Sequence, residues 1–397
     1  MTDGKPTEEE DLNTQYQMWK KTVPLMYTFM TETKMVWPSL TFDWCGYRED
    51  ETTGLSHHRA LAGTYTNGEA PDKILLMETV IPLDISTLRK PSPDGKSLDM
   101  RFKTIKEWSH DGEANKIKSC GDLMASINGE GTVFVRSIKD SVDVAPIVLK
   151  EHTTNAFGLD WSVPKGGAEN PKTLVSGGED GKVIVWDLES QKPSWQVTTT
   201  SVNDVQCHKF FPYILGVALE EGFVALYDTR ADKGTGPTLT RPPACDKPFP
   251  VNCVAFSPHS EYLFAAGTAE NTVSLFDIRN TRYQLHTLCG HEKAVTGIEF
   301  DPFHDNILGS CSEDRRVIVW NMNSFGCEEE EGDADDPSPD LFFMHGGHTA
   351  TVSAFAFNPD LEWCLGSVSD DRIAQVWGVG EQIYAPVHME VEGGQLE

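Results

Sequence analysis

The hydrophobic and polar positions of the chain repeat in short runs that are typical of β-strands. Each run ends in an aromatic residue followed by Asp or a substitute, and an acidic turn residue stands six positions before the aromatic residue. The aromatic residues are Trp186, Tyr227, Phe276, Trp320 and Trp377. The first four are 41, 49 and 44 residues apart, close to the roughly 40–45 residues of one four-stranded propeller blade. The pattern predicts five clear blades over about residues 151–378.

Weaker repeats precede these blades. Residues of about 105–138 form one unit with Thr132–Val135 as its third strand, and Arg59–Thr64 and Lys73–Thr79 belong to another. The alternating run Ser39–Trp44 is expected to complete the last blade, so that the ring closes by joining the two ends of the chain. Such closure removes exposed sheet edges. The sequence predicts an all-β fold: a seven-bladed WD-repeat β-propeller with an N-terminal α-helix and a short C-terminal helix.

A helical pattern over about residues 7–33 precedes the ring. Two apolar stripes follow it, one of Tyr16, Trp19, Val23, Met26 and Met30, the other of Met18, Leu25 and Phe29. Pro24 predicts a kink inside the helix. Such a helix can bury one stripe on its own protein and offer the other to a partner; the alternative is that both are buried. The expected division is an N-terminal acidic tail and helix (1–35), the propeller (36–378) and a C-terminal helix and tail (379–397).

An acidic insertion, residues 327–344, lengthens the last repeat to 57 residues. It contains four consecutive Glu residues and Asp-Ala-Asp-Asp-Pro-Ser-Pro-Asp, and it runs directly into Leu-Phe-Phe-Met at 341–344. A block of like charges is usually a solvated loop. Carboxylates beside an apolar ledge suit a basic amphipathic helix, whose apolar face meets the ledge while its Lys and Arg residues meet the acids.

Charge narrows the class of partner. The 397 residues include 33 basic and 61 acidic residues, a formal net charge of -28. Such a surface repels phosphate backbones, so we expect no direct nucleic-acid binding and faster association with basic proteins. The alternative is that the acidity serves only solubility. Nine scattered cysteines without a Cys-x-x-Cys pair indicate a reducing, intracellular location. The sequence shows no signal peptide and no bilayer-spanning stretch, so no membrane association is expected.

Groups that suggest catalysis recur from blade to blade. His291, Ser312, Asp314 and Trp320 reappear as His348, Ser369, Asp371 and Trp377. An enzyme needs one site, whereas a repeat needs one hydrogen-bonded brace per blade, so these groups predict braces and no enzyme.

The sequence contains no spacing of residues that predicts a metal site or a nucleotide site. The pair His57–His58 is expected in a loop, and no His or Cys spacing indicates zinc. Gly177–Lys182 lacks the hydroxyl residue that a phosphate loop needs after its Lys and reads as a hairpin turn. We therefore expect no metal and no cofactor.

Two blades end in an aromatic-Asp-x-Arg sequence, at Tyr227–Arg230 and Phe276–Arg279. These endings resemble the short motif by which some WD-repeat proteins dock onto a ubiquitin-ligase adaptor. The favoured alternative is that Arg230 and Arg279 each brace their own blade, because short motifs often match by chance.

Several segments resemble one family over nearly the whole chain. They are Tyr16–Lys21, Pro24–Tyr27, Trp37–Thr41, Gly63–Thr66, Asp111–Asn115, Asp340–Thr349 and Gln375–Tyr384. Trp37-Pro38-Ser39-Leu40 after an N-terminal helix, combined with an acidic loop before Met-His-Gly-Gly-His-Thr, is similar to the retinoblastoma-associated histone-binding WD-repeat family. The resemblance implies a histone chaperone subunit of chromatin assembly, type B histone acetyltransferase, deacetylase, remodelling or Polycomb complexes.

The resemblance also implies a binding site, in which the first helix of histone H4 lies between the N-terminal helix and the acidic loop. The N-terminal helix would contribute Leu25, Met26, Phe29 and Met30, the ledge would consist of Leu341, Phe343, Met344 and Ile383, and Asp335, Asp336 and Asp340 would pair with histone Arg and Lys residues.

A second family site lies on the flat top of the ring, where acidic residues hold the histone H3 tail or basic partner peptides. Here Glu69, Glu113, Asn115 and Asp370 match the family. Other family acids are replaced by Val36, Asn155, Asn203 and Ala294, and an Arg stands at Arg372. Each lost carboxylate removes a charge-assisted contact, so we expect this site to be weakened or to have changed its ligand.

Three functional hypotheses follow. The first is a non-catalytic histone chaperone subunit of the nucleus, with the cytoplasm as a second location, that holds histone H4 or H3–H4. The second is a WD-repeat scaffold or ubiquitin-ligase substrate adaptor without histone binding. The third is a propeller enzyme, which would need one convergent set of polar groups in the channel.

Overall fold

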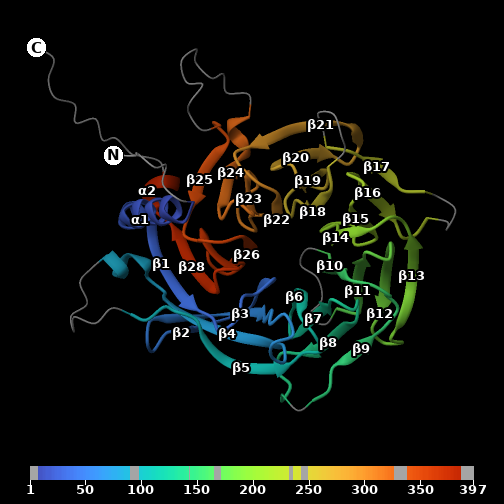
Figure 1. The fold of residues 1–397 in the computed structure, drawn as a ribbon, viewed down its shortest axis with the longest axis horizontal. Helices are drawn as coiled ribbons and strands as arrows, with labels where there is room; N and C mark the ends of the chain where they lie inside the picture. Colours follow the sequence, from blue (N-terminus) through green and yellow to red (C-terminus); the bar gives the residue numbers. More distant parts are fainter. Residues whose placement is uncertain are drawn as a thin grey trace, which may run out of the picture.

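The computed structural model describes residues 8–89, 98–142, 144–164, 171–231, 236–242, 249–325 and 338–385. In this part of the chain, seven four-stranded antiparallel sheets surround a central axis (Figure 1). A helix, α1 (Glu8–Met26), and a single turn, α2 (Glu381–Tyr384), lie outside the ring beside the last blade. The predicted seven-bladed propeller with two terminal helices is confirmed.

The blades follow one another in chain order. Blade 1 contains β2 (Phe42–Asp50), β3 (Leu55–Gly63), β4 (Lys73–Pro82) and β5 (Lys103–Ser109); blade 2 contains β6 (Ala114–Cys120), β7 (Leu123–Asn128), β8 (Val133–Ser137) and β9 (Ile147–Leu149). Blade 3 contains β10 (Ala156–Trp161), β11 (Thr173–Gly178), β12 (Lys182–Asp187) and β13 (Lys192–Thr198); blade 4 contains β14 (Val202–Cys207), β15 (Ile214–Leu219), β16 (Val224–Asp228) and β17 (Thr238–Thr240).

The remaining blades have the same plan. Blade 5 contains β18 (Val251–Phe256), β19 (Leu263–Thr268), β20 (Thr272–Asp277) and β21 (Asn280–Cys289); blade 6 contains β22 (Val295–Phe300), β23 (Ile307–Ser312), β24 (Val317–Asn321) and β25 (Leu341–His345). Blade 7 contains β26 (Val352–Phe357), β27 (Cys364–Ser369), β28 (Ile373–Val379) and, as its outermost strand, β1 (Tyr27–Lys34). Two short 3-10 helices, η1 (Ile85–Arg89) and η2 (Met322–Ser324), lie between strands.

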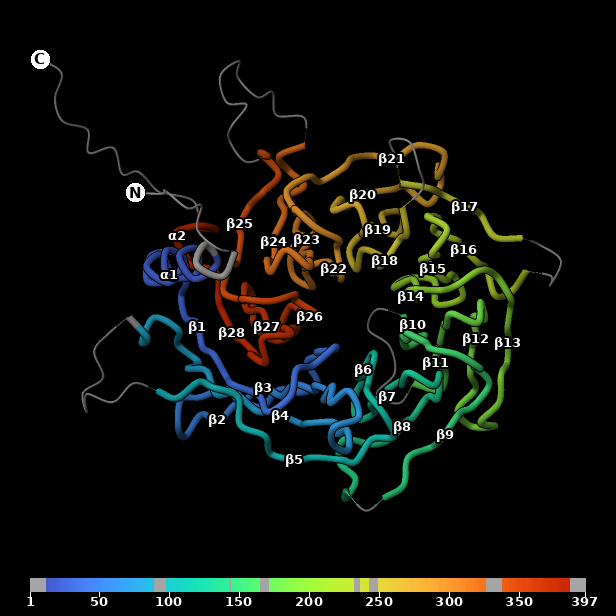
Figure 2. The backbone as a smooth tube through the Cα atoms, in the orientation of Figure 1, coloured from blue at the N-terminus to red at the C-terminus, as the bar shows by residue number. Residues whose placement is uncertain are grey.

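The ring closes with a different segment from the one expected. β1 pairs antiparallel with β28, from Tyr27 opposite Val379 to Lys34 opposite Ile373, and Figure 2 shows these ends of the chain side by side. Ser39–Trp44 does not complete blade 7; β2 begins at Phe42 as the inner strand of blade 1. Closure by the two chain ends is confirmed, but residues 27–34 belong to the propeller sheet rather than to the N-terminal segment.

The helix also ends earlier than predicted. It continues for two residues beyond Pro24 and stops at Met26, so the predicted helix over residues 27–33 is wrong. Pro24 has no N–H to donate, and its ring crowds the preceding turn. Thr28, Thr31 and Thr33 are β-branched and favour an extended strand, which the free edge of β28 then pairs.

The core lies between adjacent blades. Ile127 and Val133 of blade 2 pack against Leu159 and Trp186 of blade 3, and similar clusters recur around the ring. Because neighbours cover both faces of the middle strands, these strands are continuous apolar runs such as Val183–Trp186.

The inner strands are joined by side chains that reach the next blade. Nδ2 of Asn115 donates to the carbonyl of Ala156 at 2.9 Å, and Oγ1 of Thr296 donates to the carbonyl of Val352 at 2.7 Å. In the opposite sense, Oδ2 of Asp160 accepts from the N–H of Cys207 at 2.8 Å. Such bonds satisfy buried backbone groups across each blade junction and fix the rotation between neighbours.

The predicted braces exist, but with a different serine. In blade 6, Nδ1 of His291 donates to Asp314 (2.8 Å), Ser310 donates to Nε2 of His291 (2.8 Å), and the indole of Trp320 donates to Ser310 (2.7 Å). Ser312 instead donates to the carbonyl of Lys293 and accepts from the N–H of Asp314, within the turn. The same arrangement in blade 7 uses Ser367 rather than Ser369, and His152, Ser176, Asp180 and Trp186 form the brace of blade 3.

The Gly177–Lys182 turn agrees with the sequence prediction, whereas the His57–His58 pair does not. Gly177–Lys182 is a hairpin turn between β11 and β12, as expected, with Gly181 at φ +74°. His57 and His58 lie in β3 and not in a loop. His58 is buried and accepts a hydrogen bond from Asn358 at 3.0 Å, so it joins blade 1 to blade 7.

Candidate functional site on the rim of the propeller

Helix α1 packs against the outer strands of blades 6 and 7. Trp19 and Val23 contact the hydrophobic cluster that contains Phe343 and Trp377, and the hydroxyl of Tyr16 donates to Glu32 of β1 at 2.8 Å. Tyr16, Trp19 and Val23 belong to the first predicted stripe, and this part of the stripe faces the propeller. Figure 1 shows α1 beside β25 and β28, at the junction of the two blades.

A chain of hydrogen bonds fixes α1 to blade 7. The indole N–H of Trp19 donates to the hydroxyl of Tyr27 (3.0 Å), so this hydroxyl donates its own proton to Nδ1 of His345 (2.9 Å). Nε2 of His345 then donates to Oε1 of Gln375 (2.6 Å), and Nε2 of Gln375 donates to the carbonyl of Gly347 (2.9 Å). This direction requires a neutral His345, and burial holds the pKa of His345 well below its ordinary value.

Two glycines make room for the helix. A Cβ on Gly347 would lie 2.8 Å from Cη2 of Trp19, and one on Gly346 would lie 3.5 Å from its Cδ1. The Met-His-Gly-Gly-His-Thr sequence thus places an imidazole under Trp19 and removes the side chains that would push the indole away.

Two residues of the second predicted stripe, Met18 and Leu25, face solvent together with Met26, which was predicted in the first stripe. Met18, Leu25 and Met26 are 63, 71 and 39 % exposed. The α2 turn stands beside the end of this face, because the N–H of Gly380 donates to the carbonyl of Met26 at 2.9 Å and Gln382 donates to the carbonyl of Leu25. Large exposed apolar side chains on one helix face are typical of a protein-binding surface.

The predicted apolar site residues divide into a surface group and a buried group. Phe29 and Phe343 are 7 and 2 % exposed and belong to the core, where Phe343 stacks on Trp377 at 5.8 Å. Half-buried Leu341, Met344, Met30 and Ile383 pack on the core with part of each side chain accessible. The structure therefore brings Leu25, Met26 and Ile383 to one surface, with Phe29 and Phe343 beneath it.

Of the three predicted acidic residues, the structure describes only Asp340. Asp335 and Asp336 lie outside the described residues. Asp340 is only 5 % exposed and accepts a hydrogen bond from Nε2 of His286 at 2.7 Å. A partner's Arg or Lys cannot reach this carboxylate without displacing His286.

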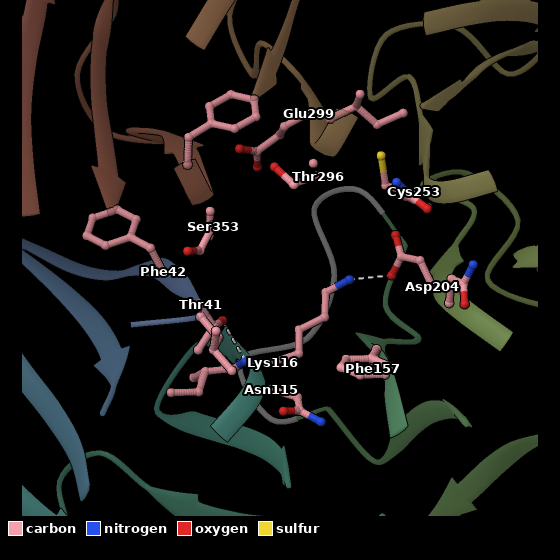
Figure 3. A pocket seen from close by; sticks show the side chains of 18 of the residues that line it. Thr41, Phe42, Asn115, Lys116, Phe157, Asp204, Cys253, Thr296, Glu299 and Ser353 are labelled. Atoms are coloured by element: carbon pink, nitrogen blue, oxygen red, sulfur yellow. Dashed lines mark hydrogen bonds and ion pairs between the residues drawn. The ribbon is translucent and has the colours of Figure 1, made fainter. Parts of the chain in front are cut away.

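Two of the four predicted top-face residues line the channel. Asn115 and Asp370 line a cavity of about 500 Å³, which Figure 3 shows from close by, whereas exposed Glu69 and half-buried Glu113 are not part of its lining. Both amide hydrogens of Asn115 are used, by Asn155 and Ala156. Asn203 donates likewise to Glu220 and Val251.

Two lysines that line the channel form ion pairs. Lys116 contacts Asp204, as Figure 3 shows, and Lys118 lies 3.1 Å from Asp43. Burial raises the pKa of nearby Glu299 to about 7, although Lys118 opposes the rise. Asp43 and Asp204 are therefore engaged by lysines and are not free to pair with a basic ligand.

Known proteins resemble the chain from end to end. Residues 14–83 match the family described as histone-binding protein RBBP4 or a subunit of the CAF1 complex, and four segments within residues 147–378 match the WD domain, G-beta repeat. Three yeast proteins named histone acetyltransferase type B subunit 2 are similar. The one from Debaryomyces hansenii is 32% identical over 98% of this chain and 96% of its own length, that from Candida albicans 31% over 99% of both, and that from Candida glabrata 32% over 93% and 89%.

The chain belongs to the histone-binding WD-repeat family. The segment that carries the family match spans α1, β1 and blade 1 as far as β4, and so includes the helix surface described above. Sequence reasoning missed Tyr27 and Gln375, which fix α1 to blade 7, and His286, which engages Asp340. Tyr27 and Gln375 stand inside quoted motifs, but the spacing along the chain gives no sign that the two are joined through His345.

The arginines of the two aromatic-Asp-x-Arg endings brace their own blades, as favoured. Arg230 pairs with Asp228 at 2.7 Å and lies over the ring of Tyr213, and Arg279 pairs with Asp277 at 2.6 Å over Tyr262. These contacts give no support to ubiquitin-ligase docking.

Among the described side chains, no group of three His, Cys, Asp or Glu residues is arranged to hold a metal ion. Neither described helix has the length and apolar character to cross a bilayer.

Proposed function

We propose that this family member is a non-catalytic subunit that holds the first helix of histone H4 on the outer surface of α1, in the nucleus, for a type B histone acetyltransferase. The observation that carries the proposal is the exposed face of Met18, Leu25 and Met26 on a helix that hydrogen bonds join to the propeller. The yeast relatives carry the name of an acetyltransferase subunit, and the family description names histone binding.

The chemistry of the rim favours a basic amphipathic helix. Such a helix lays its apolar face on Leu25, Met26 and Ile383 and turns its Lys and Arg residues towards the acidic insertion. The insertion carries Glu328–Glu331, Asp333, Asp335 and Asp336. A chain of net charge -28 also speeds the approach of a basic partner. Because Asp340 is engaged by His286, we assign direct pairing to Asp335 and Asp336 and a structural role to Asp340.

The braces argue against a catalytic role. Each Ser–His–Asp set is buried beside a Trp, and its serine hydroxyl donates to the imidazole while accepting from the indole. No substrate can reach such a hydroxyl, and the same arrangement recurs in blades 3, 6 and 7.

The test is the affinity of the full chain for a fluorescent peptide that covers the first helix of H4. Asp335→Lys combined with Asp336→Lys, and separately Leu25→Asp, should each weaken binding at least about tenfold, equivalent to about 1.4 kcal/mol. The melting temperature of Leu25→Asp should stay unchanged, because the Leu25 side chain is 71 % exposed, and a melting temperature measured for the double Lys variant controls for its fold.

Matched controls carry the same chemical changes elsewhere. Asp122→Lys with Glu189→Lys reverses two exposed carboxylates on blades 2 and 3, and Leu239→Asp alters a half-exposed apolar residue of blade 4. Both controls should bind like the unmodified chain. Unchanged peptide affinity in both rim variants would refute the H4 assignment.

For the top face we propose weak binding of basic tails. Asn115 and Asn203 have no amide hydrogen left for a ligand. Of the carboxylates on the cavity wall, Asp204 is paired with Lys116, whereas Asp370 belongs to the residues that match the family. Histone H3 association would then arise mainly through its complex with H4.

A further inference from the structure

Two buried hydrogen-bond donors lie without an acceptor at the junction of blades 1 and 2. They are Nε1 of Trp108, in β5, and Nε of Arg136, in β8. Trp108 is only 1 % exposed, and the guanidinium carbon of Arg136 lies 6.0 Å from the centroid of its ring. Of the four buried side-chain atoms in the described ranges that lack a partner, these two are the nitrogens. A buried donor without an acceptor is costly, so this pair indicates that a ligand supplies one.

A third donor group stands over the same indole. Nζ of Lys106 lies 4.6 Å from the ring centroid of Trp108 and donates to the carbonyls of Ile138 and Asp140. Lys106 and Arg136 thus bring two positive charges to one ring, which attracts each of them, while the two charges repel one another. In the part of the chain that the structure describes, no carboxylate forms an ion pair with either side chain.

The strand register brings these side chains face to face. Met124 of β7 is opposite Arg136 and packs in the same hydrophobic cluster as Trp108, so this face of blade 2 is turned to blade 1. Residues two apart in a strand share a face, so Phe134 lies on it as well, together with Val148, its partner in β9. Val148 is 44 % exposed. An apolar side chain that is open to solvent therefore stands on the same wall as the guanidinium.

The charge of Arg136 is poorly compensated by its surroundings. Burial lowers its pKa from the ordinary value, and the carboxylate of Asp140 opposes this only through space. Lys116 and Lys118 in the channel are, in contrast, each paired with an aspartate. A carboxylate accepts two charge-assisted hydrogen bonds and cancels a positive charge, whereas a water molecule brings no charge. Arg136 is half-buried and lines a cavity of about 320 Å³, so a ligand reaches it from solvent.

We propose that Trp108, Arg136 and Val148 form a binding site for an acidic side chain of a partner polypeptide. The carboxylate accepts from the guanidinium and the indole N–H, and an apolar neighbour of the acidic residue covers Val148. Such a partner is opposite in charge to a histone. The net charge of -28 repels it at long range, so recognition depends on the two local cations, within the roughly 10 Å over which charges act in salt solution.

This site is separate from the surface of α1. Blade 1 stands between blade 2 and blade 7, beside which α1 lies (Figure 1), so the chain can hold a basic and an acidic partner at the same time. The proposal does not depend on histone binding. Arg136→Gln should therefore leave the affinity for the H4 helix peptide unchanged, and a failure of either proposal leaves the other standing.

The first measurement follows the indole N–H signal of Trp108 by NMR in the full chain, assigned by its loss in Trp108→Phe. Acetate at constant ionic strength should shift this signal saturably, and Arg136→Gln should weaken the binding at least about tenfold. The matched control is Arg282→Gln, which removes an exposed guanidinium from β21 of blade 5 and should bind acetate normally. No shift in the unmodified chain, or equal binding by Arg136→Gln at an unchanged melting temperature, overturns the site.

The second measurement decides the source of the carboxylate. The peptide acetyl-Leu-Glu-Leu-amide should bind at least about fivefold more tightly than acetate, because its apolar side chains contact Val148, and the matching Gln peptide should not bind. Val148→Ser should remove this gain and leave acetate binding unchanged. Equal affinities of the Glu peptide and acetate, or tighter binding of inorganic phosphate than of acetate, would show a site for a free anion and overturn the assignment to a partner's acidic side chain.

Discussion

The inner ring of the propeller and the rim around α1 are held together in different ways. In the ring each device is repeated: the His–Ser–Asp–Trp brace stands in blades 3, 6 and 7, and side-chain bonds join successive inner strands. On the rim, one unrepeated path runs from Trp19 through Tyr27 and His345 to Gln375, and one histidine, His286, donates to Asp340 beside β25.

The difference separates stability from function. A closed ring with repeated contacts unfolds as a unit, because each blade covers the cores of two neighbours. A helix held by one path can detach while the ring stays folded, since local unfolding needs only the free energy of the contacts it breaks. Substitutions on the rim should therefore change partner binding without unfolding the propeller, whereas substitutions in the ring should destabilise the whole chain.

The largest expected effect is in the ring. Trp320→Ala removes a fully buried indole and leaves Ser310 without its donor. Large-to-small changes of this kind cost about 3–5 kcal/mol, so denaturant unfolding should shift by that amount for the whole chain. The ring would not be the cooperative frame described here if the loss stayed confined to blade 6, as hydrogen exchange would reveal.

A smaller effect is expected from acid, and it should also fall on the ring. Burial lowers the pKa of His58 to about 4 from an ordinary value of 6.5. The unfolded chain therefore binds a proton first, so this contribution is complete above about pH 6.5 and is lost as the pH falls towards 4. Between pH 7 and pH 5 the loss amounts to ~2 kcal/mol.

The effect of His58 on the free energy of unfolding has to be measured as a difference between two variants. Glu299, whose pKa is raised by burial to about 7, acts in the opposite direction, because the folded chain keeps its proton between pH 7 and 4.5. The stability gap between the unmodified chain and His58→Gln isolates His58 and should narrow by ~2 kcal/mol over pH 7 to 5. A gap that is constant with pH would contradict the assignment of a buried neutral imidazole.

The smallest effect is expected on the rim. Tyr27→Phe removes the hydroxyl that accepts from Trp19 and donates to His345, and leaves both partners unpaired at a cost of about 1–2 kcal/mol. Hydrogen exchange should rise in α1 and hardly change in blades 2–5, and binding of the H4 peptide should weaken. A uniform rise over all blades would show that α1 and the ring are one cooperative unit.

Much of the propeller could be predicted from sequence, because the same pattern of residues recurs in several blades. The spacing of Trp186, Tyr227, Phe276 and Trp320 predicts the blades, and the stripe of Tyr16, Trp19 and Val23 predicts the buried face of α1. The choice of Ser310 over Ser312 was not predictable, since both lie on the same strand and only the reach of the His291 and Trp320 rings decides between them.

The site was predicted in outline and corrected in detail. Exposed Leu25 agrees with a partner-binding second stripe, whereas Phe29, predicted in the same stripe, lies in β1 with its side chain in the core. Met26, predicted in the stripe that faces the propeller, is exposed instead. Asp340 reads as one more acid of the insertion, and only its proximity to His286, 54 residues earlier, removes its carboxylate from solvent.

The sequence by itself therefore determined the repeat, the seven blades, the acidic charge and the amphipathic α1, because these follow from local period and composition. Tertiary structure decided which segment closes the ring, which apolar residues of the rim stay exposed, and which carboxylate is engaged. The physical reason is that these outcomes depend on edges and partners that meet only after folding. The free edge of β28 makes a strand of residues 27–34, and blade 5 brings His286 to the insertion of blade 6.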